Sequence, residues 1–292
     1  MSIKTKIDTA TRIFRSGFSF LFRKKFQILS IENTVQYVLD KKCSIGRYGD
    51  GEVCMMNNRM PKSFQTFDAD FSERLKQVAK SADETFLVCL PYALVSFKNL
   101  NSFAKNFWRQ HFCRNLCDYY KYFDNDKIYG NTSITRCYMD FEDKTHSSHY
   151  FDFLKTIWEN RDIVIIEGEE SRLGVGNDLF SNTNSISRIL CPKENAYKKY
   201  DEIFSFARNL DKNKLILIAL GATATVLAYD LHREGFQALD VGHVDIEYEW
   251  MKMGAMEKLP IKGKYVNEAK DGREVINLQD ELYKSQIISI IC

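Results

Sequence analysis

The chain has 292 residues, of which 45% are hydrophobic, enough to bury a full core in one large domain or two small ones. Its 41 Lys and Arg residues nearly balance 39 Asp and Glu residues, giving a formal net charge of +2. Residues 1–30 carry seven Lys or Arg residues and one Asp, so the rest of the chain is net acidic. An acidic body argues against nucleic acid as a partner, because nucleic-acid binding needs a basic face on the folded domain.

Eight cysteines occur without a CxxC pair, and several lie inside apolar runs, where a free thiol behaves as a small hydrophobic group. This usage indicates reduced thiols in a cytoplasmic protein. We expect neither a cleavable signal peptide nor an integral membrane protein, because no apolar stretch approaches the roughly 20 residues of a membrane span.

Short apolar runs alternate with longer amphipathic runs from residue 33 onward. The predicted strands are 43–46, 85–90, 162–168, 185–190, 214–221 and 237–242. The predicted helices are 31–41 after Ser30, 70–80 after Asp68, 98–120, 147–159, 196–210 and 222–234, the last ended by Gly235. This order predicts an α/β fold whose mostly parallel sheet is covered by helices on both faces.

No low-complexity linker divides the chain, so we treat 30–260 as one domain with a C-terminal extension, 261–292, packed on it. The final apolar run of that extension predicts a last strand or helix. In the basic arm, 1–29, apolar residues form one helical stripe with basic flanks. Such a helix suits peripheral contact with the inner face of the cell membrane, or packing on the body or on a second subunit of a homo-oligomer. The sequence leaves both interpretations open.

The densest chemical signal is SIGRYGDGE, 44–52, directly after a predicted strand. Gly49 allows a ligand to approach the backbone closely, and Arg47 offers a fork of donors matched to phosphate oxygens. Asp50 and Glu52 place two carboxylates at the strand end, where they could hold Mg²⁺ or Mn²⁺ beside a diphosphate. The alternative is a surface turn, which three glycines, one Arg and two acids in nine residues make less attractive.

A second cluster, EGEESRLGVGNDLF, follows another predicted strand. Loops at the carboxyl ends of parallel strands line the ligand crevice of such folds. We therefore expect this loop to bind the phosphates or sugar of a nucleotide, through the candidates Arg172, Gly174, Gly176, Asn177 and Asp178. The alternative is a polar surface loop.

Two further segments end predicted strands. In LGATAT, Gly221 and Thr223 open a helix whose amides form an anion site, although small residues also suit close packing on the sheet. In LDVGHVDIEYEW, His243 and Asp245 are candidates for catalysis, while Asp245 also suits an N-cap and His243 a core position.

These three blocks, RYGDGE, EGEESRLGVGNDLF and LGATATVLAYDL with DVGHVDIEYEW, together resemble the bacterial GT-D type glycosyltransferases, formerly a domain of unknown function. The resemblance covers roughly residues 30–255. It implies a Rossmann-like α/β fold, a UDP-sugar donor and a metal-binding Asp-x-Glu motif, which Asp50 and Glu52 match.

The expected reaction moves a hexose, glucose or galactose, from a UDP-sugar to a bacterial surface glycan, polysaccharide repeat or glycoprotein. A divalent cation, Mn²⁺ or Mg²⁺, would stabilise the leaving diphosphate, and Asp245 or His243 would act as base. Two alternatives remain: a nucleotide-sugar hydrolase, and a noncatalytic nucleotide-sugar or glycan-binding partner of another transferase.

Overall fold

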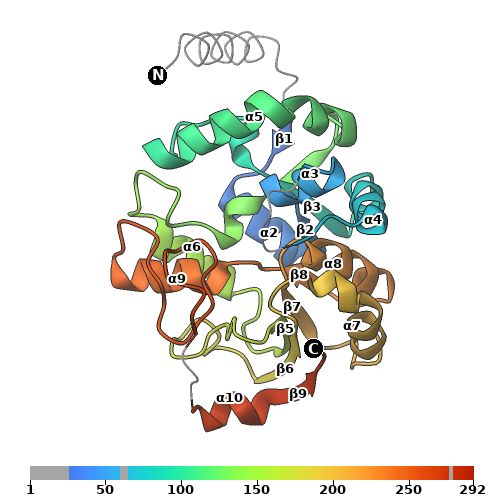
Figure 1. The fold of residues 1–292 in the computed structure, drawn as a ribbon, viewed down its shortest axis with the longest axis vertical. Helices are drawn as coiled ribbons and strands as arrows, with labels where there is room; N and C mark the ends of the chain where they lie inside the picture. The colour runs from blue at the N-terminus through green and yellow to red at the C-terminus, as the bar shows by residue number, and fades with distance from the viewer. Residues whose placement is uncertain (1–25, 60–64, 276–278) are drawn as a thin grey trace.

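The computed structural model describes residues 26–59, 65–275 and 279–292. Within these residues, all strands join one parallel sheet in the order β1-β4-β3-β2-β8-β7-β5-β6-β9 (Figure 1). The strands are β1 (Gln27–Ile28), β2 (Ser44–Arg47), β3 (Phe86–Leu90), β4 (Ile128–Asn131), β5 (Asp162–Gly168), β6 (Ser185–Cys191), β7 (Leu215–Ala219), β8 (Ala238–Asp240) and β9 (Ile287–Ile290).

The α-helices are α2 (Ile31–Lys41), α3 (Asp50–Met56), α4 (Ala69–Ala79), α5 (Ser102–Tyr122), α6 (Ser147–Lys155), α7 (Tyr200–Ala207), α8 (Thr223–Arg233), α9 (Val244–Met253) and α10 (Glu281–Gln286). Short 3₁₀ turns are η1 (Tyr92–Leu94), η2 (Thr132–Thr135) and η3 (Ala196–Lys199). Among the described residues, no helix is long and apolar enough to cross a bilayer.

Two hydrophobic layers cover the two faces of the sheet, because successive side chains of a strand point in opposite directions. Val164 and Ile166 of β5 belong to the layer formed with α3, α4, α7 and α8. Ile163 and Ile165 belong to the layer formed with α2, α6 and α9. In Figure 1 these two groups of helices lie on opposite sides of the strands. The predicted α/β class, with a parallel sheet and helices on both faces, is confirmed.

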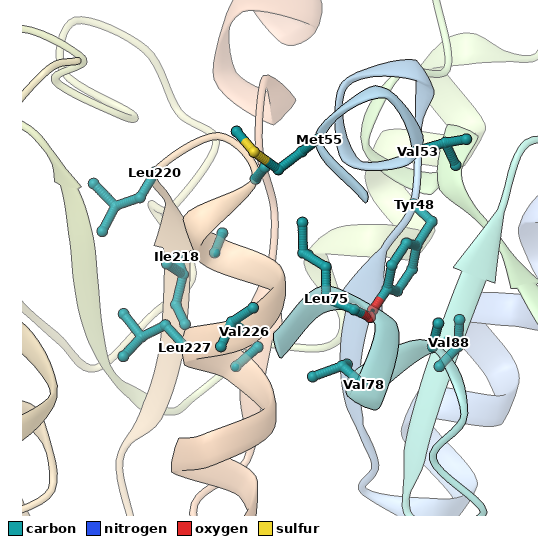
Figure 2. Packing of buried hydrophobic residues seen from close by; sticks show 14 of the residues in the cluster. Tyr48, Val53, Met55, Leu75, Val78, Val88, Ile218, Leu220, Val226 and Leu227 are labelled. Carbon is teal, nitrogen blue, oxygen red and sulfur yellow. Dashed lines mark hydrogen bonds between the residues drawn. The ribbon is translucent and has the colours of Figure 1, made fainter. Parts of the chain in front are cut away.

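Figure 2 shows the first layer where α3, α4 and α8 meet beside the central strands. The ring of Tyr48, which follows β2, is fully buried there, and its hydroxyl donates to the carbonyl of Leu75 in α4 at 2.7 Å. This bond satisfies the polar end of a buried aromatic side chain and fixes the chain directly before Gly49. The packing therefore holds the start of the glycine-rich segment in place.

All six predicted strands and six predicted helices occur; 31–41 and 162–168 match their elements at both ends, and the others have shifted ends. The predicted caps are also present, since Ser30 accepts from the Asn33 amide at 3.1 Å and Asp68 from the Phe71 amide at 2.9 Å. Gly235 follows α8 with a φ of 90°. The elements that were not predicted include β1 and β4, which are short, α3, which begins within the glycine-rich segment, and α10.

The sheet extends into both predicted flanking segments. Strand β1 begins at Gln27, inside the segment assigned to the basic arm, and β9 of the C-terminal extension pairs with β6. The interpretation of the arm as a membrane or subunit contact concerns residues 1–25, which lie outside the described residues.

Candidate functional site

A cleft of about 880 Å³ lies at the carboxyl ends of β2 and β8. These strands are neighbours, yet the chain leaves β2 through α3 on one face of the sheet and leaves β8 through α9 on the other. The two loops therefore diverge and open a crevice, as at the ligand-binding switch point of other open parallel sheets. The lining residues include Arg47, Gly49, Asp50, Glu52, Gly221, His243 and Asp245.

The Asp-x-Glu segment, which the sequence placed at the end of a strand, forms the first turn of α3. Gly49 is the N-cap, and its amide donates to Glu52 Oε2 at 2.7 Å. A Glu at the third helical position that binds the cap amide stabilises a helix start, which explains why a glycine-rich segment is helical here. Asp50, at the first helical position, is exposed at the cleft.

Burial, with the nearby carboxylates of Asp240 and Asp50, raises the pKa of Glu52 to about 7. Crowded carboxylates repel one another, so a cation placed between them would favour the ionised form. No group of three or more carboxylate, imidazole or thiol side chains within the described ranges converges to hold a metal. The residues nevertheless fit Mg²⁺ or Mn²⁺, because such ions often take one or two carboxylates and complete their shell with substrate phosphates and water.

Arg47 is tied into the sheet at the bottom of the cleft. Its Nε and Nη2 lie 3.2 and 3.0 Å from Asp240 Oδ1, and its Nη1 donates to Thr135 Oγ1 at 2.7 Å. The guanidinium still lines the cleft. A Cβ added to Gly242, whose φ is 45°, would lie 1.8 Å from Arg47 Nη2, so only glycine leaves room for this arrangement.

His243 is the N-cap residue of α9 and faces the same cleft. Its Nε2 lies 3.1 Å from Asn267 Oδ1 and 3.6 Å from Glu268 Oε1. Since both partners are acceptors, Nε2 carries the hydrogen and Nδ1 keeps a free electron pair. Burial lowers the pKa of His243, which favours the neutral ring at pH 7.

Glu268 anchors the wall beside His243. Arg136 donates to both of its oxygens at 2.8 Å, and Lys258 also contacts it. Although burial opposes ionisation, Arg136, with His243 and Lys258, holds the pKa of Glu268 well below its ordinary value. The charged Glu268 thus lies beside the Nε2–H of His243, whose hydrogen bond is accepted by Asn267.

Asp245, the other candidate base, is buried beneath the cleft, in the first turn of α9 and not at its N-cap. Its Oδ1 accepts from the Gly174 amide at 2.8 Å and from Asn177 Nδ2 at 2.7 Å, and its Oδ2 pairs with Lys264 Nζ at 2.7 Å. A carboxylate saturated in this way is poorly placed to accept a substrate proton. The structure therefore favours a positioning role for Asp245 and leaves His243 as the stronger candidate.

The second predicted cluster lies mostly outside the cleft. Arg172 is buried and donates to the Gly263 carbonyl at 2.7 Å. Asp178 accepts from the Tyr248 hydroxyl at 2.9 Å, and Gly176 borders a separate small pocket. Arg172, Gly174, Gly176, Asn177 and Asp178 are absent from the cleft lining, whereas the neighbouring Ser171 and Leu173 contribute to it. This loop instead contacts α9, through Asp245 and Tyr248.

The third predicted segment does reach the cleft. Gly221, with a φ of 56°, and Ala222 line it at the start of α8. Thr223 is fully buried, and its Oγ1 has no hydrogen-bond partner among the described residues. The structure thus brings Gly221 to the site and places Thr223 in the layer between α8 and the sheet.

Several lining residues have no counterpart in the sequence prediction. Arg136 and Glu268 come from segments without a motif, and an aromatic group comes from η1 and α5: Tyr92, Phe103, Phe107 and Trp108. The segment 106–123 is rich in aromatic residues, but such a helix is as typical of core or interface as of a ligand site. The spacing of Phe103 and Phe107 continues to the buried His111, Asn115 and Tyr119, so spacing alone does not separate these lining residues from core.

Known proteins share this architecture. A family profile described as "Glycosyltransferase GT-D fold" matches residues 45–269. The chain is 40% identical to "A New Glycosyltransferase (DUF1792) from Streptococcus sanguinis", with a TM-score of 0.87 over 92% of this chain and 100% of that one. It is 38% identical to a structure described as "The highly conserved domain of unknown function 1792 has a distinct glycosyltransferase fold", with a TM-score of 0.86 over 92% and 97% of the two chains.

Two curated streptococcal proteins are also similar. The chain is 41% identical to "Probable glycosyl transferase Gly" of Streptococcus gordonii and 40% identical to "Glycosyltransferase GlyD" of Streptococcus pneumoniae. Each alignment covers 91% of this chain but only 39% and 32% of those longer proteins. The fold, the family profile and these relatives agree: the chain belongs to the family of glycosyltransferases with the GT-D fold.

Proposed function

We propose that this protein transfers a hexose, glucose or galactose, from a UDP-sugar to a hydroxyl of a bacterial glycan or glycoprotein. The observation that carries the proposal is the exposed carboxylate of Asp50 at the switch-point cleft of a GT-D fold, with Glu52 two residues later in the same helical turn. The cleft volume of about 880 Å³ suits a nucleotide-sugar, since ligand sites commonly enclose about 300–1,000 Å³.

Asp50 and Glu52 hold the divalent cation, Mn²⁺ or Mg²⁺, in this proposal. When bound, the cation supplies positive charge that stabilises the departing UDP. Arg47 adds a fixed positive charge at the cleft floor, because Asp240 and Thr135 prevent it from swinging away. Gly221 and Ala222 bring the start of α8 to the cleft, where the helix dipole favours phosphate.

His243 acts as the base that accepts the proton of the acceptor hydroxyl. Asn267 and Glu268 fix its Nε2–H, so the neutral ring presents Nδ1 as the proton acceptor. Asp245 holds the neighbouring loop through the Gly174 amide and leaves the reacting atoms to His243. These roles extend to this chain what the family membership implies and what the cleft geometry supports.

A donor panel tests the proposal. The protein is incubated with Mn²⁺ and UDP-glucose, UDP-galactose or UDP-N-acetylglucosamine, and UDP release is followed with and without sugar acceptors. Release that depends on both a hexose donor and an acceptor supports transfer. Equal release with water alone identifies a nucleotide-sugar hydrolase, and binding of the donor without release identifies a noncatalytic binding partner; either result contradicts the proposal.

A further inference from the structure

One wall of the cleft is unusually apolar for a surface. Phe103, Phe107 and Tyr92 line it while remaining 69%, 40% and 39% exposed. Large aromatic side chains stabilise a protein most when they are buried. Three of them exposed together in a concave site therefore indicate a binding site for a ligand that covers them. Trp108 lines the same wall, half-buried behind Phe107, with ring centroids 5.3 Å apart.

Phe103, Phe107 and Trp108 belong to α5, whereas Tyr92 belongs to η1. Phe103 and Phe107 are four residues apart and share one face of the helix, and His111 follows at the same spacing. The Phe107 and His111 rings are stacked with centroids 6.3 Å apart. From Phe103 to His111 the helix rises by about 12 Å.

The far end of this stripe reaches the metal motif. His111 Nε2 lies 3.2 Å from the Tyr119 hydroxyl, which lies 3.4 Å from the Gly49 carbonyl. Gly49 is the cap residue directly before Asp50. The exposed aromatic rings are thus the outer part of a helix face that ends beside the carboxylates proposed to serve the donor.

The polar neighbours of this wall suit a ligand with an apolar face and a rim of hydroxyl groups. Ser96 and Asn99, which stand between Tyr92 and Phe103 in the sequence, line the cleft, as does Asp140. Lys258 Nζ lies 5.8 Å from the centroid of the Phe103 ring. A hydrocarbon chain is a poor match for this wall, because it would cover the polar groups without offering them a hydrogen-bond partner. A pyranose ring offers both a C–H face and hydroxyls.

We infer that Tyr92, Phe103, Phe107 and Trp108 form the acceptor subsite, on which the sugar rings of a neutral glycan stack. This inference rests on the proposed transfer of a hexose and adds the chemistry of the second substrate. The donor lies at the ends of β2 and β8, and the terminal sugar of the acceptor enters along α5, so that its hydroxyl meets the donor near Asp50 and His243.

Tryptophan fluorescence gives a readout that does not depend on turnover. The chain has three tryptophans, and Trp158 and Trp250 are fully buried, so quenching by acrylamide reports mainly on Trp108. The probes are the methyl glycosides of glucose, galactose and N-acetylglucosamine and of their β-linked disaccharides. We expect at least one disaccharide to protect Trp108 from acrylamide. Absence of protection by every probe would overturn the inference.

Variants assign the effect to the wall. Phe103→Ala removes the most exposed ring, and Phe107→Leu removes a flat ring while keeping an apolar side chain beside Trp108. Phe206→Ala is the matched control, because Phe206 is a helical Phe with 37% exposure outside the cleft lining. Phe103→Ala and Phe107→Leu should raise the KM for the acceptor about five- to twentyfold, with a much smaller change in the KM for the donor. Phe206→Ala should change neither.

The outcomes separate the two proposals. If the protein transfers sugar but both wall variants keep the wild-type acceptor KM and Trp108 protection, the acceptor subsite is wrong and the proposed function stands. If no donor yields UDP, the proposed function fails. The acceptor subsite can still be tested in that case, because protection of Trp108 by sugars does not depend on turnover. Comparing maltose with dodecyl maltoside excludes a lipid site: protection by the detergent alone would overturn the inference.

Discussion

Arg47 and Asp240 join the two central strands of the sheet where its cleft opens. Nε and Nη2 of Arg47 lie 3.2 and 3.0 Å from the same Asp240 oxygen, and the Arg47 amide lies 3.3 Å from the other. The two residues end β2 and β8, which are neighbours in space but 193 positions apart in sequence. The pair therefore fixes the width of the crevice between the loops that carry Asp50 and His243.

Asp240→Asn should destabilise the fold by about 3 kcal/mol, because it leaves the Arg47 charge without its partner in a largely buried site. Glu202→Gln is the control, since the Lys199–Glu202 pair is exposed and should contribute less than about 1 kcal/mol. Urea unfolding of both variants measures the difference. Equal free energies of unfolding would show that the central pair is dispensable.

Gly242→Ala should disrupt the same pair sterically, because the new Cβ would collide with the Arg47 guanidinium. Gly254→Ala is a matched control: Gly254 also has a positive φ, 63°, but open space around the added atom. Both changes carry the backbone strain of about 1–3 kcal/mol, and only Gly242→Ala adds the collision. We expect a lower melting temperature and a lower kcat for Gly242→Ala; two equally stable, equally active variants would contradict this account.

Asp50→Asn should reduce metal-dependent UDP release by about a hundredfold or more, since removing one charge-stabilising group typically costs about 10²–10³ in kcat. Asp201→Asn replaces another first-turn Asp, in α7, outside the cleft, and should be silent. The free energy of unfolding should change by less than about 0.5 kcal/mol in both variants. Mn²⁺ binding followed by calorimetry supplies an independent readout, and undiminished binding by Asp50→Asn would refute the metal assignment.

Glu52 should make both stability and metal binding depend on pH. Its pKa is raised to about 7 in the folded protein, so its contribution to stability is fully present below the unfolded pKa near 4.5 and is lost as the pH rises through about 7. Without metal, the melting temperature should therefore fall between pH 5 and pH 8 by more in the wild type than in Glu52→Gln.

Mn²⁺ should displace the Glu52 proton. Calorimetry at pH 6.5 in buffers with different ionisation enthalpies should detect proton release from the wild type on Mn²⁺ binding, and little from Glu52→Gln. Indistinguishable proton release from the two proteins would exclude Glu52 as a group that loses its proton to the cation.

His243 should determine the acidic limb of the pH–rate profile at saturating Mn²⁺. Because burial lowers its pKa, the neutral ring persists below the ordinary value of 6.5, and kcat should decline only at lower pH. His243→Gln should lower kcat by about 10²–10⁴ and remove this limb. Asn267→Leu should retain part of the activity with the limb displaced. An unchanged limb in His243→Gln would assign the base elsewhere.

The local signals of the sequence determined the fold class and one half of the site. Continuous apolar runs specified strands buried on both faces, and the capping residues Ser30 and Asp68 marked helix starts correctly. The Asp50–Glu52 segment stood out because its chemistry is contiguous. Strand β1 has only two residues, and β4 has the sequence IYGN, so neither contains an apolar run that marks a strand.

Only the tertiary structure determined which partners each polar side chain contacts. The sequence indicated Arg172 as a ligand-binding residue and Asp245 as a catalytic residue. In the structure, Arg172 donates a hydrogen bond to the Gly263 carbonyl. The carboxylate of Asp245 accepts from Gly174, Asn177 and Lys264. These partners are 19 to 91 positions away along the chain. Such pairings depend on the order of strands in the sheet and on side-chain packing, which periodicity and spacing along a single chain do not encode.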